Sequence, residues 1–128
     1  MAGEDTDFSD EFCQFLQANM PAVEAAELVL ALRRDPDRWW TLREVLDTGV
    51  SLRAEDGPRT VEGLQARGLI AVDAEGRLQY RAPEPLAGHV ATLEKVYRER
   101  PVTLIRVIYG LRDSKIRSFA EAFRLRRK

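Results

Sequence analysis

The sequence predicts a mostly α-helical protein with one small two-stranded β-hairpin. Apolar residues recur every three or four positions in several segments, which is the period of an amphipathic helix. Two short segments, 69–72 and 77–81, flank the tight polar loop 73–76, and apolar residues alternate in the second of them, as in a hairpin strand. The length of 128 residues and the 45% hydrophobic content fit one globular domain with a single core.

The first part of the chain is expected to be a mobile acidic terminus over residues 1–8, followed by two helices. Ser9 can cap the first helix, because its hydroxyl can accept a hydrogen bond from a free N–H of the first turn. Pro21 is tolerated at the start of the next helix, which runs to Arg34, and a positive charge suits a helix C-terminus.

Two further helices are marked by their ends. Thr41 and Glu44 have the spacing of a capping box, which predicts a short helix over 42–47. Pro58 begins the next helix, and Gly68 is expected to end it in the left-handed conformation. Trp39 and Trp40 lie just before the capping box, and we expect one to anchor the core and the other to be half exposed.

The hairpin strand over 77–81 has a period of two. This places Leu78 and Tyr80 inward, and Arg77, Gln79 and Arg81 outward.

Residues 83–128 are expected to form a helical extension of the same compact domain as residues 9–82. It contains a helix over 84–98, then a helix from Pro101 that is apolar nearly all round, for which only a buried position is suitable. A last helix follows and ends in four basic residues.

The order of a helix, a short helix, a turn, a helix and a hairpin resembles that of the winged helix-turn-helix superfamily. The stretch from Val61 to Ile70, with its glycine at the end of a helix, is the most specific part, and the resemblance covers about half of the chain. It implies a winged helix-turn-helix core, with the hairpin as a β-wing and extra N- and C-terminal helices. It also implies a bacterial transcriptional regulator that places the helix after Pro58 in the major groove of duplex DNA and the wing beside the backbone.

On this reading, the DNA-contacting residues are arginines that can bind phosphate or a guanine edge, with one threonine beside them. They are Arg43, Arg53, Arg59, Thr60, Arg67, Arg77 and Arg81. Three acidic residues, Glu55, Asp56 and Glu62, oppose this interpretation, because carboxylates repel phosphate.

The alternative is a winged helix that binds a protein and touches no DNA. DNA binding requires Arg43, Arg53, Arg59 and Arg77 to form one continuous positive face, whereas the alternative predicts that Glu55, Asp56 and Glu62 interrupt it. The net charge is −7 over residues 1–32, zero over 33–82 and +6 over 83–128. The two charged ends either neutralise each other or leave a basic tail that can contact nucleic acid.

The apolar C-terminal helices also predict a homodimer, since a monomer of this size would struggle to bury both of them. The expected interface residues are Ile105, Ile108, Phe119 and Phe123. In the alternative, these helices fold back on the N-terminal helix and the chain stays a monomer.

No pattern in the sequence indicates an enzyme, a cofactor or a metal. The chain lacks a nucleophile elbow, a phosphate-binding glycine loop and a pair of histidines or cysteines at ligand spacing. We interpret the single histidine, His89, as structural and the single cysteine, Cys13, as a packing residue. The absence of a long apolar run and the acidic first residues predict a cytoplasmic protein that does not enter a membrane.

Overall fold

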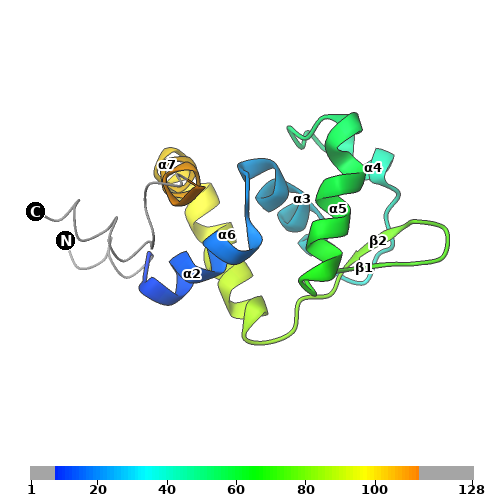
Figure 1. Cartoon of the computed structure of the whole chain (residues 1–128). Coiled ribbons are helices and arrows are strands. Elements are labelled where there is room, and N and C mark those ends of the chain that lie inside the picture. The colour runs from blue at the N-terminus through cyan, green and yellow to red at the C-terminus, as the bar shows by residue number, and fades with distance from the viewer. Residues whose placement is uncertain (1–7, 113–128) are drawn as a thin grey trace, which may run out of the picture. The chain divides into compact units, whose positions relative to one another are not determined.

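The computed structural model describes residues 8–112, which are mostly helical and contain one two-stranded antiparallel sheet (Figure 1). The predicted helix-rich class with a hairpin is therefore confirmed. In chain order, the elements are α2 (Asp10–Asn19), α3 (Val23–Arg33), α4 (Leu42–Leu46), the 3₁₀ turn η1 (Ala54–Asp56), α5 (Gly57–Ala66), β1 (Ile70–Val72), β2 (Leu78–Tyr80), α6 (Leu86–Glu99) and α7 (Pro101–Arg112).

The chain divides into two compact units. One unit is Glu24–Val90, which holds most of α3, then α4, α5, the hairpin and the first residues of α6. Among the described residues, the other unit is formed by 8–23 and 91–112, so α2 belongs with α7 rather than with the hairpin. We call these the hairpin unit and the terminal unit.

The short helix α4 begins where its capping box predicts. The Thr41 hydroxyl oxygen accepts the Glu44 N–H at 3.1 Å, and the Glu44 carboxylate accepts the Thr41 N–H at 2.9 Å. Each side chain thus satisfies an N–H that the helix itself leaves unpaired. Val45 is fully buried and carries the inner side of α4.

The end of α5 also follows its local signal. Gly68 has φ +80°, in the left-handed region that only glycine adopts without strain, and the chain then enters β1. Leu64 and Leu69, on either side of this glycine, are buried.

The hairpin pairs Ile70 with Tyr80 and Val72 with Leu78 in antiparallel register. A third segment joins the sheet: Trp40 donates its N–H to the Leu78 carbonyl at 2.8 Å and accepts the Leu78 N–H at 2.6 Å. Trp40 is buried and Trp39 is half-buried, as expected for one anchoring and one partly exposed tryptophan.

The structure corrects the predicted orientation of Gln79, which is buried rather than outward. Its amide nitrogen donates to the Asp37 carbonyl at 2.9 Å. The outward side of β2 is not open to solvent here, because the segment that leads to Trp40 runs along it.

In the terminal unit, α2 starts at the predicted cap and packs against α7. The Ser9 hydroxyl accepts the Phe12 N–H at 3.1 Å, and Phe12 and Leu16 are buried. The guanidinium of Arg100 lies 5.1 Å from the ring centroid of Phe8.

The expectation that α7 is buried all round is wrong. Leu104 and Ile108 are buried, but Val102, Ile105 and Tyr109 are 61%, 37% and 41% exposed. The helix therefore has an inner and an outer side, and the outer side is also apolar.

The last predicted helix, with Phe119 and Phe123, and the acidic residues 1–7 lie outside the described residues. Within residues 8–112, no single helix combines the length and the apolar character needed to cross a membrane.

Candidate interaction surface on α5 and the hairpin

The outer side of α5 is the surface that was predicted from the sequence to lie in the major groove of duplex DNA. Pro58, Arg59, Glu62 and Gln65 are exposed along this helix, while Leu64 on the opposite side is buried. The helix begins at Gly57 with Pro58 in its first turn, where the missing proline N–H costs no hydrogen bond. Thr60 is half-buried at the edge of this surface.

Two arginines, one just before η1 and one in the first turn of α5, share one carboxylate. Asp56 accepts Nε of Arg53 at 3.2 Å on one oxygen and Nη2 of Arg59 at 3.3 Å on the other. The Glu55 carboxylate also lies near Arg53, with 3.7 Å between its Oε2 and Nη1 of Arg53. Both arginines are well exposed, at 71% and 83%, so these pairs are solvent-screened and each contributes little to stability.

The arginine at the tip of the hairpin is paired in the same way. Arg77 lies 2.8 Å from Asp73 and 3.4 Å from Glu75. Partial burial acts to raise the pKa of Asp73, but hydrogen bonds from the backbone and side chain of Arg77, together with its charge, outweigh it and lower this pKa. The loop thus holds an ionised Asp73 as its own counter-charge.

Arg81 and Arg67, which were also predicted to contact DNA, use their guanidinium groups in contacts within the chain. Arg81 donates through Nε to the Gln79 amide oxygen at 2.9 Å, and its guanidinium lies 5.9 Å from the ring centroid of Trp39. Arg67 donates to the Gly63 carbonyl of its own helix at 3.2 Å.

Arg43 differs from the other candidates. It is exposed on α4, and its side chain makes no hydrogen bond or ion pair that involves the described part of the chain.

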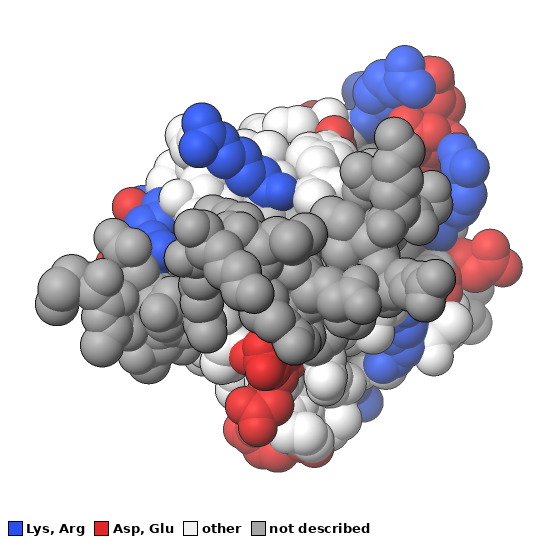
Figure 2. Space-filling view, turned by 60° about the vertical axis from the view of Figure 1, so that its left-hand side comes forward, with Lys and Arg blue, Asp and Glu red and all other residues white. Residues whose placement is uncertain are grey.

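The predicted arginines therefore do not form one continuous positive face. Asp56 separates Arg53 from Arg59, and Asp73 neutralises Arg77. Where the described surface is visible in Figure 2, blue and red side chains lie next to one another at the upper right rather than forming a blue area alone. The hairpin unit as a whole carries nine arginines, no lysine and twelve acidic residues, a net charge of −3.

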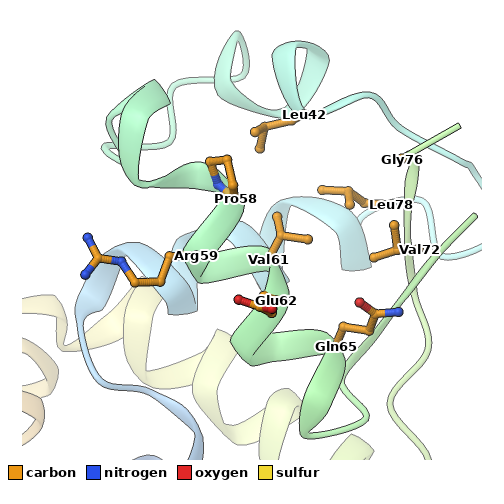
Figure 3. Close-up of a pocket in the computed structure, with 9 residues that line it drawn as sticks. All are labelled: Leu42, Pro58, Arg59, Val61, Glu62, Gln65, Val72, Gly76 and Leu78. Atoms are coloured by element: carbon orange, nitrogen blue, oxygen red, sulfur yellow. The ribbon is translucent and has the colours of Figure 1, made fainter.

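A cleft lies between α5 and the hairpin, with one wall reaching α4. It is open to solvent, has a volume of about 710 Å³ and is lined by Leu42, Pro58, Arg59, Val61, Glu62, Gln65, Val72, Gly76 and Leu78. Figure 3 shows the side chains of Val61, Leu42, Leu78 and Val72 around the hollow, with Arg59, Glu62 and Gln65 along α5. We call this the α5–hairpin cleft; its floor is apolar and its α5 rim is polar.

One wall of the cleft depends on a glycine. A Cβ atom added at Gly57 would lie 2.6 Å from Cδ2 of Leu42, closer than two carbon atoms can approach. A side chain at residue 57 would therefore force the end of the Leu42 side chain to move.

The residues expected at a dimer interface fall into three groups. Ile105 is exposed on α7, in line with that expectation, whereas Ile108 is 1% exposed and packs inside its own chain. Ile108 is corrected to a core residue, because it lies one helical turn beyond the buried Leu104 and so on the inner side of α7. Phe119 and Phe123 lie outside the described residues.

Sequence reasoning missed the cleft and the shared carboxylate. The second had a signal, since Asp56 is spaced three residues from both Arg53 and Arg59, a spacing that brings side chains together on helical turns. The cleft had none, because its lining comes from three segments that are far apart in the chain.

Among residues 8–112, no group of three or more His, Cys, Asp or Glu side chains is arranged to hold a metal ion. The lone Cys13 is buried. Compared with family models, with curated proteins and with solved structures, the chain gave no match.

Proposed function

We propose that the hairpin unit is a winged-helix module that recognises another protein through α5, the hairpin and the cleft between them. The order α3, α4, α5, β1, β2 within one compact unit supports the winged-helix assignment. In this assignment, α5 corresponds to the recognition helix and the loop 73–76 to the tip of the wing.

The observation that carries the choice of a protein partner is the charge of this surface. Its candidate phosphate-binding arginines are accompanied by Glu55, Asp56, Asp73 and Glu75, and Glu62 lies in the middle of α5. Duplex DNA is bound mainly through phosphate neutralisation by unopposed cations. An apolar cleft with a polar rim is instead the usual composition of a protein-binding surface.

Duplex DNA is the second candidate, and one feature favours it. The Arg43 side chain has no ion-pair partner among residues 8–112, and exposed arginine pairs of the kind formed by Arg53 and Arg59 contribute only about 0–1 kcal/mol each. Phosphate groups can therefore displace Asp56 at small cost, as in a transcriptional regulator that binds DNA with a modest set of arginines.

A salt titration separates the two candidates. Fluorescence anisotropy of a labelled random duplex is measured with the full-length chain from about 50 to 200 mM salt. We expect no saturable binding near physiological salt. Binding with a steep negative dependence on salt, reduced by Arg43→Ala but not by Arg34→Ala, would establish DNA as the ligand instead, since Arg34 is an exposed arginine just after α3 and away from this surface.

Self-association through α7 is a separate part of the proposal. It is supported by the exposed apolar side chains of Val102, Ile105 and Tyr109.

A further inference from the structure

Negative charges outnumber positive charges on both sides of the α5–hairpin cleft. Over residues 53–62, which include the first half of α5, Arg53 and Arg59 are opposed by Glu55, Asp56 and Glu62, which leaves a net charge of −1. On the hairpin side, the tip holds Asp73, Glu75 and Arg77, again with a net charge of −1.

The excess negative charge on α5 is located on Glu62. Both oxygens of Asp56 already accept arginine donors, and Glu55 lies beside Arg53. Glu62 is exposed and lines the cleft, and its side chain forms no hydrogen bond or ion pair with the described residues. Among the described carboxylates counted here, that of Glu62 is thus the one available to a cation of a partner.

The floor beside Glu62 is apolar. Val61 precedes it on α5, and Leu42, Val72 and Leu78 complete the lining from α4 and the hairpin (Figure 3). Val61, Val72 and Leu42 are only half-buried, so a branched side chain placed there would remove further apolar area from water.

Building on the proposed function, we infer that the α5–hairpin cleft binds a protein segment that presents a branched apolar side chain next to a lysine or arginine. The apolar side chain enters between Val61, Val72 and Leu78, and the cation binds the Glu62 carboxylate. Charge complementarity selects this partner chemistry, because an acidic segment would meet the excess negative charge of both walls.

Small probes test this without knowledge of the natural partner. The full chain is labelled with ¹³C at Leu and Val methyl groups and titrated, at low ionic strength, with 3-methylbutan-1-amine, 3-methylbutanoate or 3-methylbutan-1-ol. These share the branched chain and differ in charge. We expect the amine to shift the methyl signals of Leu42, Val61, Val72 and Leu78 saturably, and to bind about fivefold more tightly than the alcohol. The carboxylate should bind more weakly than the alcohol.

Two variants isolate the role of Glu62. In Glu62→Gln, the preference for the amine over the alcohol should disappear while the alcohol binds as before. Glu55→Gln makes the same change of charge at an exposed acid outside the cleft and should keep most of the preference. Absence of saturable shifts with the amine and the alcohol overturns the inference, and so does an amine preference that survives Glu62→Gln.

The same labelled sample distinguishes this inference from the proposed function. Random duplex DNA is added in place of the probes. Saturable shifts of the cleft methyl signals by DNA at physiological salt would overturn protein recognition as the function, whatever the amine does. Failure of the amine alone would leave protein recognition in place but remove the basic, branched segment as its partner.

Discussion

Trp40 and Leu78 exchange two backbone hydrogen bonds, with N···O distances of 2.8 and 2.6 Å. The pair ties the residue just before the α4 cap to the first residue of β2. Leu42 follows two positions after Trp40 and lines the α5–hairpin cleft, as Leu78 does. The bridge therefore fixes the α4 wall of the cleft to its floor, so the cleft belongs to a single packed unit.

Asp56 is predicted to suppress phosphate binding by Arg53 and Arg59. Asp56→Asn should release both guanidinium groups, and we expect binding of random duplex DNA at low salt to strengthen by about three- to tenfold, with a steeper salt dependence. Anisotropy titrations measure this. Asp35→Asn, the same change of charge in an exposed loop of the hairpin unit, is the control. Equal effects of the two variants would mean that only net charge, and not the shared carboxylate, matters.

Gly68 is predicted to be required for its backbone conformation. At φ +80° a Cβ atom is strained, so Gly68→Ala should lower the free energy of unfolding by roughly 1–2 kcal/mol, although the added atom has open space. Urea unfolding followed by tryptophan fluorescence reports on this unit, because both tryptophans lie in it.

The matched change in a helix should act in the opposite direction. Gly110 lies within α7 and has no atom within 4 Å of an added Cβ, so Gly110→Ala should raise stability by about 0.5–1 kcal/mol in unfolding followed by circular dichroism. If Gly68→Ala and Gly110→Ala lowered the free energy of unfolding to the same extent, the backbone conformation of the glycine would not decide the effect of the added methyl group.

The start of α2, the start of α4 and the end of α5 could be predicted from the sequence because each has a cause within a few residues. Ser9, the Thr41–Glu44 capping box and Gly68 each act on hydrogen bonds or dihedral angles within a few residues, and the structure places the corresponding helix ends there. The bridge between Trp40 and Leu78 joins residues that are 38 positions apart, and no local pattern encodes it.

Errors arose where burial depends on distant segments. Gln79 alternates with inward residues and was expected to be outward, yet the segment near Asp37 covers it. The outer side of α7 was expected to be buried, because its sequence is apolar nearly all round. Periodicity shows which sides of a helix are apolar, but it does not show which of them another element covers.

Acid is predicted to weaken the cap of α4. The backbone hydrogen bond from Thr41, opposed by partial desolvation and assisted by the charge of Arg38, lowers the pKa of Glu44. A lowered folded-state pKa gives a contribution to stability that is complete above the unfolded value, near pH 4, and is lost as the pH falls through the folded value. The difference in unfolding free energy between the parent and Glu44→Gln should therefore be larger at pH 7 than at pH 3. A difference that grows towards low pH would contradict this sign. Asp73→Asn should follow the same trend, since the pKa of Asp73 is also lowered.

Gly57 is predicted to control the shape of the cleft. In Gly57→Ala, the new methyl group must displace Cδ2 of Leu42, the mobile end of its side chain, so the loss of stability should be modest, about 1 kcal/mol. The displaced Leu42 side chain should change the methyl shifts of the cleft and weaken binding of 3-methylbutan-1-ol. The double variant Gly57→Ala with Leu42→Ala removes the clash and should recover stability relative to the sum of the two single changes. Strict additivity in this cycle would rule out the predicted contact.

The outer side of α7 is predicted to mediate weak dimerisation. Val102, Ile105 and Tyr109 occupy positions separated by three and four residues, which form one stripe along a helix. In a two-fold antiparallel pair, Val102 of each copy would face Tyr109 of the other, with Ile105 near the axis. The exposed stripe is short, so the expected dissociation constant is micromolar or weaker.

Light scattering at rising concentration should show an average mass that increases from 14.6 kDa towards about twice that value. Ile105→Lys should hold the mass at that of the monomer, whereas Gln17→Lys, at an exposed position of α2, should not. Ile108→Lys should instead unfold the terminal unit, because Ile108 is buried within its own chain. A monomer mass for the parent at every concentration would show that this stripe does not mediate dimerisation.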